Sequence, residues 1–175
     1  MKIHYLGPSG TYSEIAAKKA AGKNPKLIPQ ASLDDVAKAV SESKEAGVIP
    51  YYNYIIGFLE NGLDILRNYR LKKAGEVRVP IIFALGGRNN GKIYSHIRAL
   101  EQCCDYLNKN YGESERIPVS STAAGVIKVK KSKNGLAIAN IETLKKYKLE
   151  IIANDIGNRV NGAQNYSDFY VISSC

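Results

Sequence analysis

The sequence predicts an α/β fold, and three observations support this prediction. Short apolar runs, of the length of buried strands, alternate with longer amphipathic stretches of helical period. Glycine and hydroxyl residues gather where an apolar run gives way to such a stretch, as at residues 7–11 and 120–125. Charged residues make up 23% and hydrophobic residues 45% of the chain, which is typical of a globular protein.

Strands and helices are expected to alternate in the first half of the chain. Ile15, Ala16 and Ala20 recur at helical spacing on one face. Ser32 and Asp35 have the spacing of a capping box, which starts a second helix. Pro50 has no amide hydrogen for a sheet ladder, so we expect it to end the third strand. The expected strands are 2–6, 26–29, 46–49 and 76–85, the last broken at Pro80, and the expected helices are 12–21, 33–43 and 58–69.

The second half shows the same alternation, with turn residues at 86–87 and 89–91. Residues 157–164 are polar and contain glycine, which indicates a loop. The expected strands are 92–95, 116–119, 135–139, 149–153 and 168–173, and the expected helices are 97–111, 122–131 and 141–147.

Two crossings, near Pro80 and near Asn154, are expected to divide the chain into two lobes. Lobe one would comprise residues 1–79 and 155–175, and lobe two residues 80–154. We expect a cleft between these lobes.

Composition excludes several classes of function. The net charge is +9, but the basic residues are scattered over expected helices and turns, so we expect no nucleic-acid partner. No apolar run approaches the roughly 20 residues that span a membrane, and the N-terminus lacks the apolar core of a signal peptide. A cytoplasmic protein without a membrane partner is expected. Its three cysteines should be reduced, and neither they nor the two histidines have metal spacing, so no metal and no cofactor are expected.

Two turns could bind an anion. In the first, a strand meets a glycine-containing turn and then a helix, with Gly10, Thr11 and Ser13 as candidate contacts. Glycines let backbone amides approach a ligand, and a helix N-terminus favours negative charge. In the second, Ser121, Thr122 and Ala123 open a helix after a strand, and their hydroxyls and amides suit a carboxylate. For both turns, simple helix capping is the alternative.

Two further segments carry polar and aromatic residues at strand ends, where α/β sheets place their ligands. Tyr51, Tyr52, Asn53 and Tyr54 suggest a pocket for a ring-shaped substrate, unless the tyrosines pack as ordinary aromatics. Asn53 is also a candidate cap for the helix that follows. Asn165, Ser167, Asp168 and Phe169 precede or open the last strand, where a turn capped by Asp168 is the alternative. His96 is expected to cap a helix rather than to act in catalysis.

Taken in order along the chain, these segments resemble the prephenate dehydratase family. The opening motif is Tyr5-Leu6-Gly7-Pro8-Ser9-Gly10-Thr11-Tyr12-Ser13. The second is Gly47-Val48-Ile49-Pro50 with Asn53 and Gly57. Then follow Gly75-Glu76, Tyr94-Ser95-His96 with Ala99-Leu100 and Gln102-Cys103, and Ser121-Thr122-Ala123.

The resemblance implies a two-lobed, periplasmic-binding-protein-like (type II) fold, with two small sheets flanked by helices. It implies a small dianionic substrate, prephenate, held in the inter-lobe cleft, and a homodimer. The C-terminal regulatory domain often fused to such enzymes is not expected.

Two motifs depart from the family's pattern. The family usually has a glutamate and a serine where Tyr52 and Tyr54 flank Asn53, and Thr-Arg-Phe where this chain has Ser167-Asp168-Phe169. In the family, the threonine is thought to help protonate the leaving ring hydroxyl. The paired tyrosines resemble the prephenate decarboxylases of bacilysin-type antibiotic pathways, which remove the ring carboxylate without aromatising the ring.

We therefore expect a decarboxylase that gives a dihydro-4-hydroxyphenylpyruvate, with Tyr52, Asn53 and Ser167 as catalytic residues. One alternative is a prephenate dehydratase that serves phenylalanine biosynthesis and uses Ser167 as its hydroxyl donor. Another is a non-catalytic anion-binding module.

Overall fold

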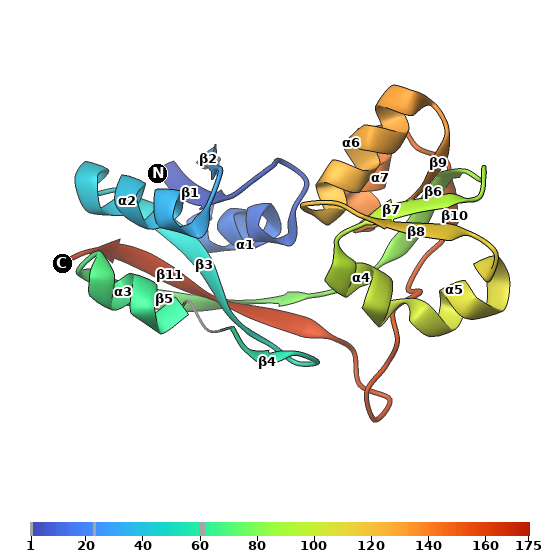
Figure 1. Cartoon of the computed structure of the whole chain (residues 1–175). Helices are drawn as coiled ribbons and strands as arrows, with labels where there is room; N and C mark the ends of the chain where they lie inside the picture. Colours follow the sequence, from blue (N-terminus) through green and yellow to red (C-terminus); the bar gives the residue numbers. More distant parts are fainter. Residues whose placement is uncertain (1, 23, 60–61) are drawn as a thin grey trace. The chain divides into compact units, whose positions relative to one another are not determined.

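The computed structural model describes residues 2–22, 24–59 and 62–175 and confirms the α/β prediction. The chain forms two compact units: unit 1 comprises Met1–Pro80 and Asn165–Cys175, and unit 2 comprises Ile81–Gln164. Figure 1 shows the chain leaving unit 1 once and returning to it in its last strand. The sequence analysis placed the return after residue 154. The intervening loop instead belongs to unit 2, because Ile156 N–H donates to Phe83 O and Gln164 Nε2 to Ile81 O.

Unit 1 contains a mixed six-stranded sheet. Its strands lie in the order β2-β1-β3-β11-β5, and β4 pairs with β3. Strand β1 is parallel to both of its neighbours, whereas β11 is antiparallel to both of its own. The strands are β1 (Lys2–Leu6), β2 (Lys26–Gln30), β3 (Ala46–Asn53), β4 (Gly57–Phe58), β5 (Leu71–Pro80) and β11 (Tyr166–Ser174).

Helices cover both faces of this sheet. Helix α1 (Tyr12–Ala21) packs on the face that presents Tyr5, Val48 and Phe169, here called the α1 face. Helices α2 (Leu33–Ser43) and α3 (Gly62–Asn68) pack on the other face, which presents Ile49 and Ile172 and is called the α2/α3 face. Thr11 and Ser32 cap α1 and α2 with their side chains, so both helices begin where the sequence predicted.

The prediction that Pro50 ends the third strand is wrong, because β3 continues to Asn53. The pairing of β3 with β1 ends at Val48, and beyond it a β-bulge leaves Tyr51 without a partner on β11. Edges and bulges tolerate a proline, because its missing N–H interrupts no ladder there. The bulge also changes the alternation of side chains. Asn53 therefore lies on the α1 face, opposite Ser167, whereas Tyr52 lies opposite Asp168 on the α2/α3 face.

The helix expected at residues 58–69 is shorter than predicted. Strand β4 occupies Gly57–Phe58 and α3 begins at Gly62, while residues 60 and 61 of the prediction lie outside the described residues. Asn53 does not cap a helix. Its Oδ1 accepts the N–H groups of Ile55 and Ile56, both at 3.1 Å, and so closes the turn between β3 and β4.

Unit 2 contains a five-stranded sheet in the order β10-β6-β9-β7-β8. The strand predicted at 76–85 is two strands, β5 and β6, in different units. The helix predicted at 97–111 is interrupted at Cys103, because Asn158 N–H donates to Gln102 O and Asn158 Oδ1 accepts from Asp105 N–H. The elements are β6 (Ala84–Arg88), β7 (Lys92–Ser95), β8 (Glu115–Pro118), β9 (Gly135–Ala139), β10 (Ile151–Ala153), α4 (Ile97–Gln102), α5 (Cys104–Tyr111), α6 (Thr122–Ser132) and α7 (Ile141–Lys146).

Two further expectations can be compared with the structure. Cys103, Cys104 and Cys175 are all free thiols, as predicted. Within residues 2–22, 24–59 and 62–175, no helix has the length and apolar character needed to cross a bilayer.

Candidate functional site

The central feature of unit 1 is a hydrogen bond between Asn53 at the end of β3 and Ser167 near the start of β11. Asn53 Nδ2 lies 2.8 Å from Ser167 Oγ and also donates to Tyr166 O at 3.1 Å. The opposite end of the amide, Oδ1, accepts two backbone N–H groups. An oxygen must stand where two N–H donors converge, so the orientation of the amide is fixed and its NH₂ group faces Ser167.

This orientation determines what the Ser167 hydroxyl can do. Its oxygen accepts from Asn53, so its own hydrogen is not used in that bond. No acceptor among the described residues takes this hydrogen. Ser167 is only 9% exposed and Asn53 5%, so the pair is largely shielded from water. The pair therefore presents a held hydroxyl that can donate to a ligand.

The turn before α1 lies at the same end of the sheet as this pair. Strands β1 and β3 are parallel neighbours, and both run toward this end of the sheet, where β1 finishes at Leu6 and β3 at Asn53. Helix α1 packs on the face that carries Asn53 and Ser167. The first candidate segment and the Asn53–Ser167 pair thus share one face and one end of the sheet.

Glu14 occupies a backbone donor of this turn. Its carboxylate accepts from Gly10 N–H and from Ser9 Oγ, and it forms an ion pair with Lys18 at 3.1 Å. Burial alone would raise the pKa of Glu14, but these hydrogen bonds and Lys18 together lower it below its ordinary value. The Gly10 amide predicted for a ligand is therefore engaged by the protein's own carboxylate.

Thr11 acts as the cap that the sequence allowed. Its Oγ1 accepts from Glu14 N–H and donates to Leu6 O at 3.1 Å. Ser13 lies in the first turn of α1 and is buried.

The three tyrosines around Asn53 do not lie on the same face of the sheet as Asn53. Tyr51 stacks on Tyr170 with ring centroids 3.8 Å apart, Tyr52 packs edge-on against Phe58, and Tyr54 stacks on Tyr166. These contacts place them on the α2/α3 face. Burial and then a hydrogen bond to Glu76 raise the pKa of Tyr51 to about 12, so this phenol stays protonated.

Asp168 also lies on the α2/α3 face, where it is held by Arg78 of β5. The guanidinium donates through Nε to Oδ1 at 2.8 Å and through a second nitrogen to Oδ2 at 2.9 Å. The Arg78 guanidinium also lies over the Tyr166 ring, 3.9 Å from its centroid. The negative charge that departs from the family's pattern therefore has a bidentate partner within the sheet.

Of the other residues predicted in this segment, Phe169 is part of the core on the α1 face and is 2% exposed. Asn165 is buried just before β11.

The second candidate turn belongs to unit 2. Ser121 caps α6, because its Oγ accepts from Ala124 N–H at 3.0 Å, and Thr122 and Ala123 form the first turn. His96 caps α4 through its ring nitrogen, as predicted.

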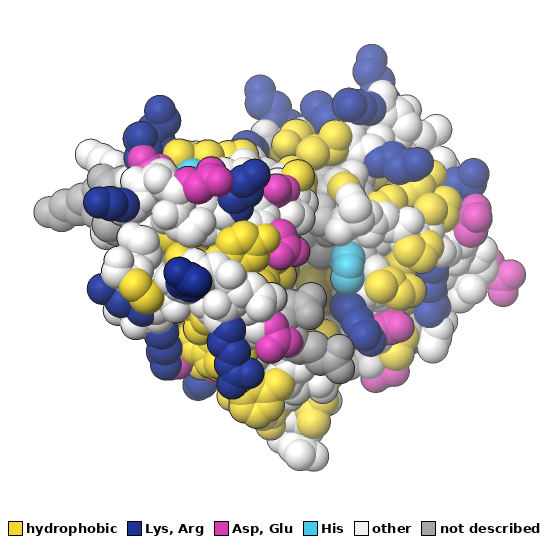
Figure 2. All heavy atoms as spheres, turned by 60° about the vertical axis from the view of Figure 1, so that its left-hand side comes forward, with side chains coloured by type: hydrophobic (Ala, Val, Ile, Leu, Met, Phe, Trp, Pro, Cys, Tyr) yellow, Lys and Arg dark blue, Asp and Glu magenta, His cyan; other side chains and the backbone are white. Residues whose placement is uncertain are grey.

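The sequence prediction missed Arg78 and the bulge at Tyr51, for which Pro50 within an apolar run was a signal. Thr11 and Glu14 have the spacing of a capping box in the sequence, but the bond from Gly10 N–H to the Glu14 carboxylate was not predicted. No group of metal-ligating side chains occurs among the residues that the structure describes. Figure 2 shows lysine and arginine side chains spread over the visible surface rather than gathered in one patch.

Comparison with known proteins identifies the family. The Prephenate dehydratase family matches residues 3–175. The chain belongs to this family. Among curated relatives, a bifunctional chorismate mutase/prephenate dehydratase of Stutzerimonas stutzeri is 33% identical over 99% of this chain and 49% of its own length. A prephenate dehydratase of Lactococcus lactis subsp. cremoris is 33% identical over 89% of this chain and 58% of its own length. The chain spans about half the length of the curated relatives it matches.

Solved structures agree with this assignment. The prephenate dehydratase of Arthrobacter aurescens in complex with L-Phe gives a TM-score of 0.85 at 25% identity, covering 100% of this chain and 60% of that chain. A Bacillus subtilis lipoprotein described as methionine-binding shares the fold alone, with a TM-score of 0.51 at 13% identity over 99% of this chain and 83% of that one. The fold predicted from the family resemblance, with two small sheets flanked by helices, is confirmed.

Proposed function

We propose that this chain is a prephenate dehydratase, a lyase that converts prephenate to phenylpyruvate, carbon dioxide and water. The observation that carries the proposal is the Ser167 hydroxyl, whose oxygen accepts from Asn53 so that its hydrogen is left for a ligand. The family resemblance gives the same position the role of assisting departure of the ring hydroxyl.

The reaction needs one proton at the departing oxygen. The bond between the ring and its carboxylate breaks, and its electron pair enters the ring. The bond from the ring to the hydroxyl then breaks, which leaves an aromatic ring. The departing hydroxide takes one proton and leaves as water, so prephenate dianion plus one proton gives phenylpyruvate anion, carbon dioxide and water. General acid help of this kind is commonly worth about 10²–10⁴-fold.

Two of the departures from the family's pattern, at Tyr52 and Asp168, are compatible with dehydration. Tyr52 and Asp168 lie directly opposite each other in the β3–β11 register. A glutamate and an arginine at these two positions would form an opposite-charge pair across the strands. Here Arg78 supplies the cation for Asp168 from the other neighbouring strand. The two changes thus exchange one charge pair for another, and Ser167 and Asn53 are left in place on the α1 face.

The second candidate is prephenate decarboxylation without aromatisation. It is favoured by the paired tyrosines before Asn53 and by serine in place of the family's threonine. The ring would keep its hydroxyl and take a proton on carbon, and carbon dioxide would be the only group lost.

Product mass separates the two candidates. The protein is incubated with prephenate, beside an enzyme-free blank, and the products are identified by mass spectrometry. We expect phenylpyruvate, lighter than prephenate by carbon dioxide and water. A product lighter by carbon dioxide alone would support decarboxylation, and unchanged prephenate would support a non-catalytic binding module.

Asp168→Asn is the matched control on the other face of the sheet. Because Asp168 points away from Ser167, we expect this variant to lower the melting temperature and to leave the product unchanged. A switch of product in Asp168→Asn would contradict the assignment of the chemistry to the α1 face.

A further inference from the structure

Unit 2 contains a basic cavity of about 330 Å³. It is lined by the end of β6, the last turns of α6 and the connection from α7 to β10. Pockets for small molecules typically start at about 300 Å³. Its cationic lining residues are Arg88, Lys130, Lys133 and Lys148.

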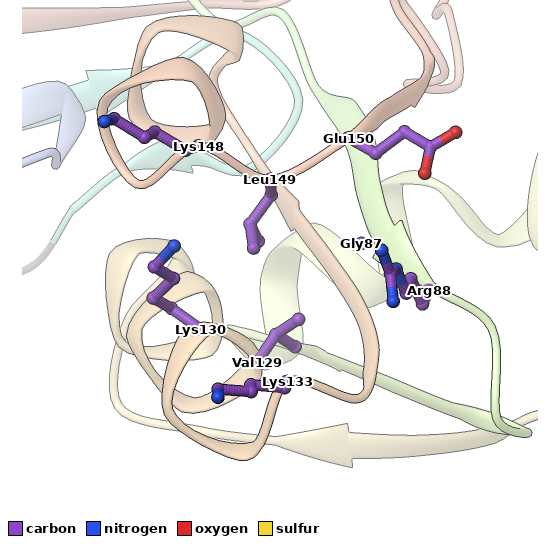
Figure 3. A pocket seen from close by; sticks show the side chains of 8 residues that line it. All are labelled: Gly87, Arg88, Val129, Lys130, Lys133, Lys148, Leu149 and Glu150. Atoms are coloured by element: carbon purple, nitrogen blue, oxygen red, sulfur yellow. The ribbon is translucent and has the colours of Figure 1, made fainter.

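None of these four cationic side chains has a hydrogen bond or ion pair with a described residue. Four other cations of unit 2 do have carboxylate partners, in the pairs Lys92–Glu115, Arg98–Glu101, Lys145–Glu142 and Arg159–Asp155. The carboxylate of Glu150, which also lines the cavity, points away from Leu149 and the three lysines (Figure 3). The neighbouring side chains therefore neutralise only part of the positive charge of the cavity.

Helix ends explain part of this charge but not all of it. Lys130 lies in the last turn of α6, Lys133 directly follows that helix, and Lys148 follows α7. Lysine complements the helix dipole at such ends. Each helix end carries about −0.5 charge, so both ends and Glu150 together contribute about −2. Four cations exceed this by about two charges, which matches a ligand with two negative charges.

The arrangement of the lining indicates how those two charges are placed. Figure 3 shows Lys130, Lys133 and Lys148 on one side of Leu149 and Arg88 on the other. Leu149 and Val129 form an apolar floor between the two sides. A ligand that fits has an apolar body and an anionic group at each end.

We propose that this cavity binds a small organic dianion whose two anionic groups are separated by an apolar body. The proposal rests on the cavity alone and is independent of the reaction assigned to unit 1.

Terephthalate, which has two carboxylates across a benzene ring, is the probe, and benzoate is its single-charge counterpart. Binding is measured by titration calorimetry at about 0.15 M salt, where surface charge is screened. We expect saturable binding of terephthalate, and benzoate binding weaker by about tenfold or more, because one charge-assisted contact is lost.

Arg88→Gln and Lys148→Gln should each weaken terephthalate binding by about tenfold or more. Lys131→Gln is the matched control, because Lys131 is an exposed residue of α6 and does not line this cavity. It removes the same charge and should change binding by less than about threefold. Ser167→Ala should leave terephthalate binding unchanged. Circular dichroism melts establish that each variant is folded.

Several results would overturn the proposal. One is the absence of saturable terephthalate binding, and another is equal affinity for benzoate. Equal weakening of terephthalate binding by Lys131→Gln and Lys148→Gln would show that the ligand is attracted by the general positive charge of the surface. Tight binding of a short oligonucleotide, weakened equally by the same two substitutions, would show the same. Loss of terephthalate binding in Ser167→Ala would place the ligand in unit 1.

Discussion

The orientation of the Asn53 side-chain amide determines the direction of its hydrogen bond with Ser167. A carboxamide has a donor end and an acceptor end, and two backbone N–H groups fix which end faces Ser167. The sequence identified both residues as candidates but not the direction of the hydrogen bond. That direction depends on the turn at Ile55 and Ile56, which the sequence analysis had assigned to the approach to a helix.

Asn53→Asp tests this positioning role. An aspartate keeps an oxygen for the two backbone N–H groups, so the turn should form, but it has no N–H for Ser167. The Ser167 hydrogen should then turn to the carboxylate instead of the substrate. We expect kcat for phenylpyruvate formation to fall by about 10²-fold or more, with a much smaller change in KM. A higher KM with an unchanged kcat in this variant would show that Asn53 acts in substrate binding instead.

Glu14 is expected to make the stability of the fold depend on pH in the acid range. Its folded pKa lies below its ordinary value of 4.5. This carboxylate therefore stabilises the fold above the unfolded pKa, and the stabilisation disappears as pH falls through the folded pKa. Urea unfolding from about pH 6 to about pH 3 should show a smaller loss of free energy in Glu14→Gln than in the unchanged protein. Equal losses in both proteins would count against this role.

At the scale of elements, helix starts and isolated strands were the easiest features to predict. Helices α1 and α2 and strands β1, β7 and β9 have the predicted bounds, because caps or local patterns define them. The errors lie where a distant segment intervenes. Asn158 interrupts the helix at Cys103, and β11 supports β3 beyond Pro50. No local pattern contains this information.

The bulge in β3 explains why the candidate site was only partly predicted. Residues 51–54 were expected beyond the end of the third strand, but residues 51–53 belong to it, and alternation alone does not say which of them share a face. One unpaired residue, Tyr51, puts Asn53 with Ser167 and turns Tyr52 to the other face. Tertiary pairing, rather than residue type, selects the members of the site.

Gly47 tests the packing of α2 on β3. A Cβ there would lie 2.7 Å from Val40 Cγ2 and 3.1 Å from Val36 Cγ1, both buried side chains of α2. Gly47→Ala should therefore destabilise the protein by about 1–3 kcal/mol in chemical denaturation. Gly75→Ala is the matched control on β5, because its Cβ would meet nothing closer than 3.9 Å, and we expect a change within about 0.5 kcal/mol. Similar losses in both variants would show that strand glycines matter for another reason.

At the scale of the whole molecule, the chain forms two α/β units. It passes from unit 1 to unit 2 once, after Pro80, and returns once, after Gln164. The net charge of +9 that raised the question of nucleic acid includes the unpartnered cations of the unit 2 cavity. The family follows from the order of motifs along nearly the whole chain, whereas the proposed reaction depends on a few side chains in unit 1. This is why the sequence predicted the family more firmly than the chemistry.

The central claim is that the Ser167 hydroxyl assists departure of the ring hydroxyl. It is tested most directly by the initial rate of phenylpyruvate formation from saturating prephenate in Ser167→Ala, relative to the unchanged protein and to Ser167→Thr. We predict a fall of about 10²–10⁴-fold in the alanine variant and retained activity in the threonine variant. An alanine variant that forms phenylpyruvate within a few-fold of the unchanged rate would contradict the account.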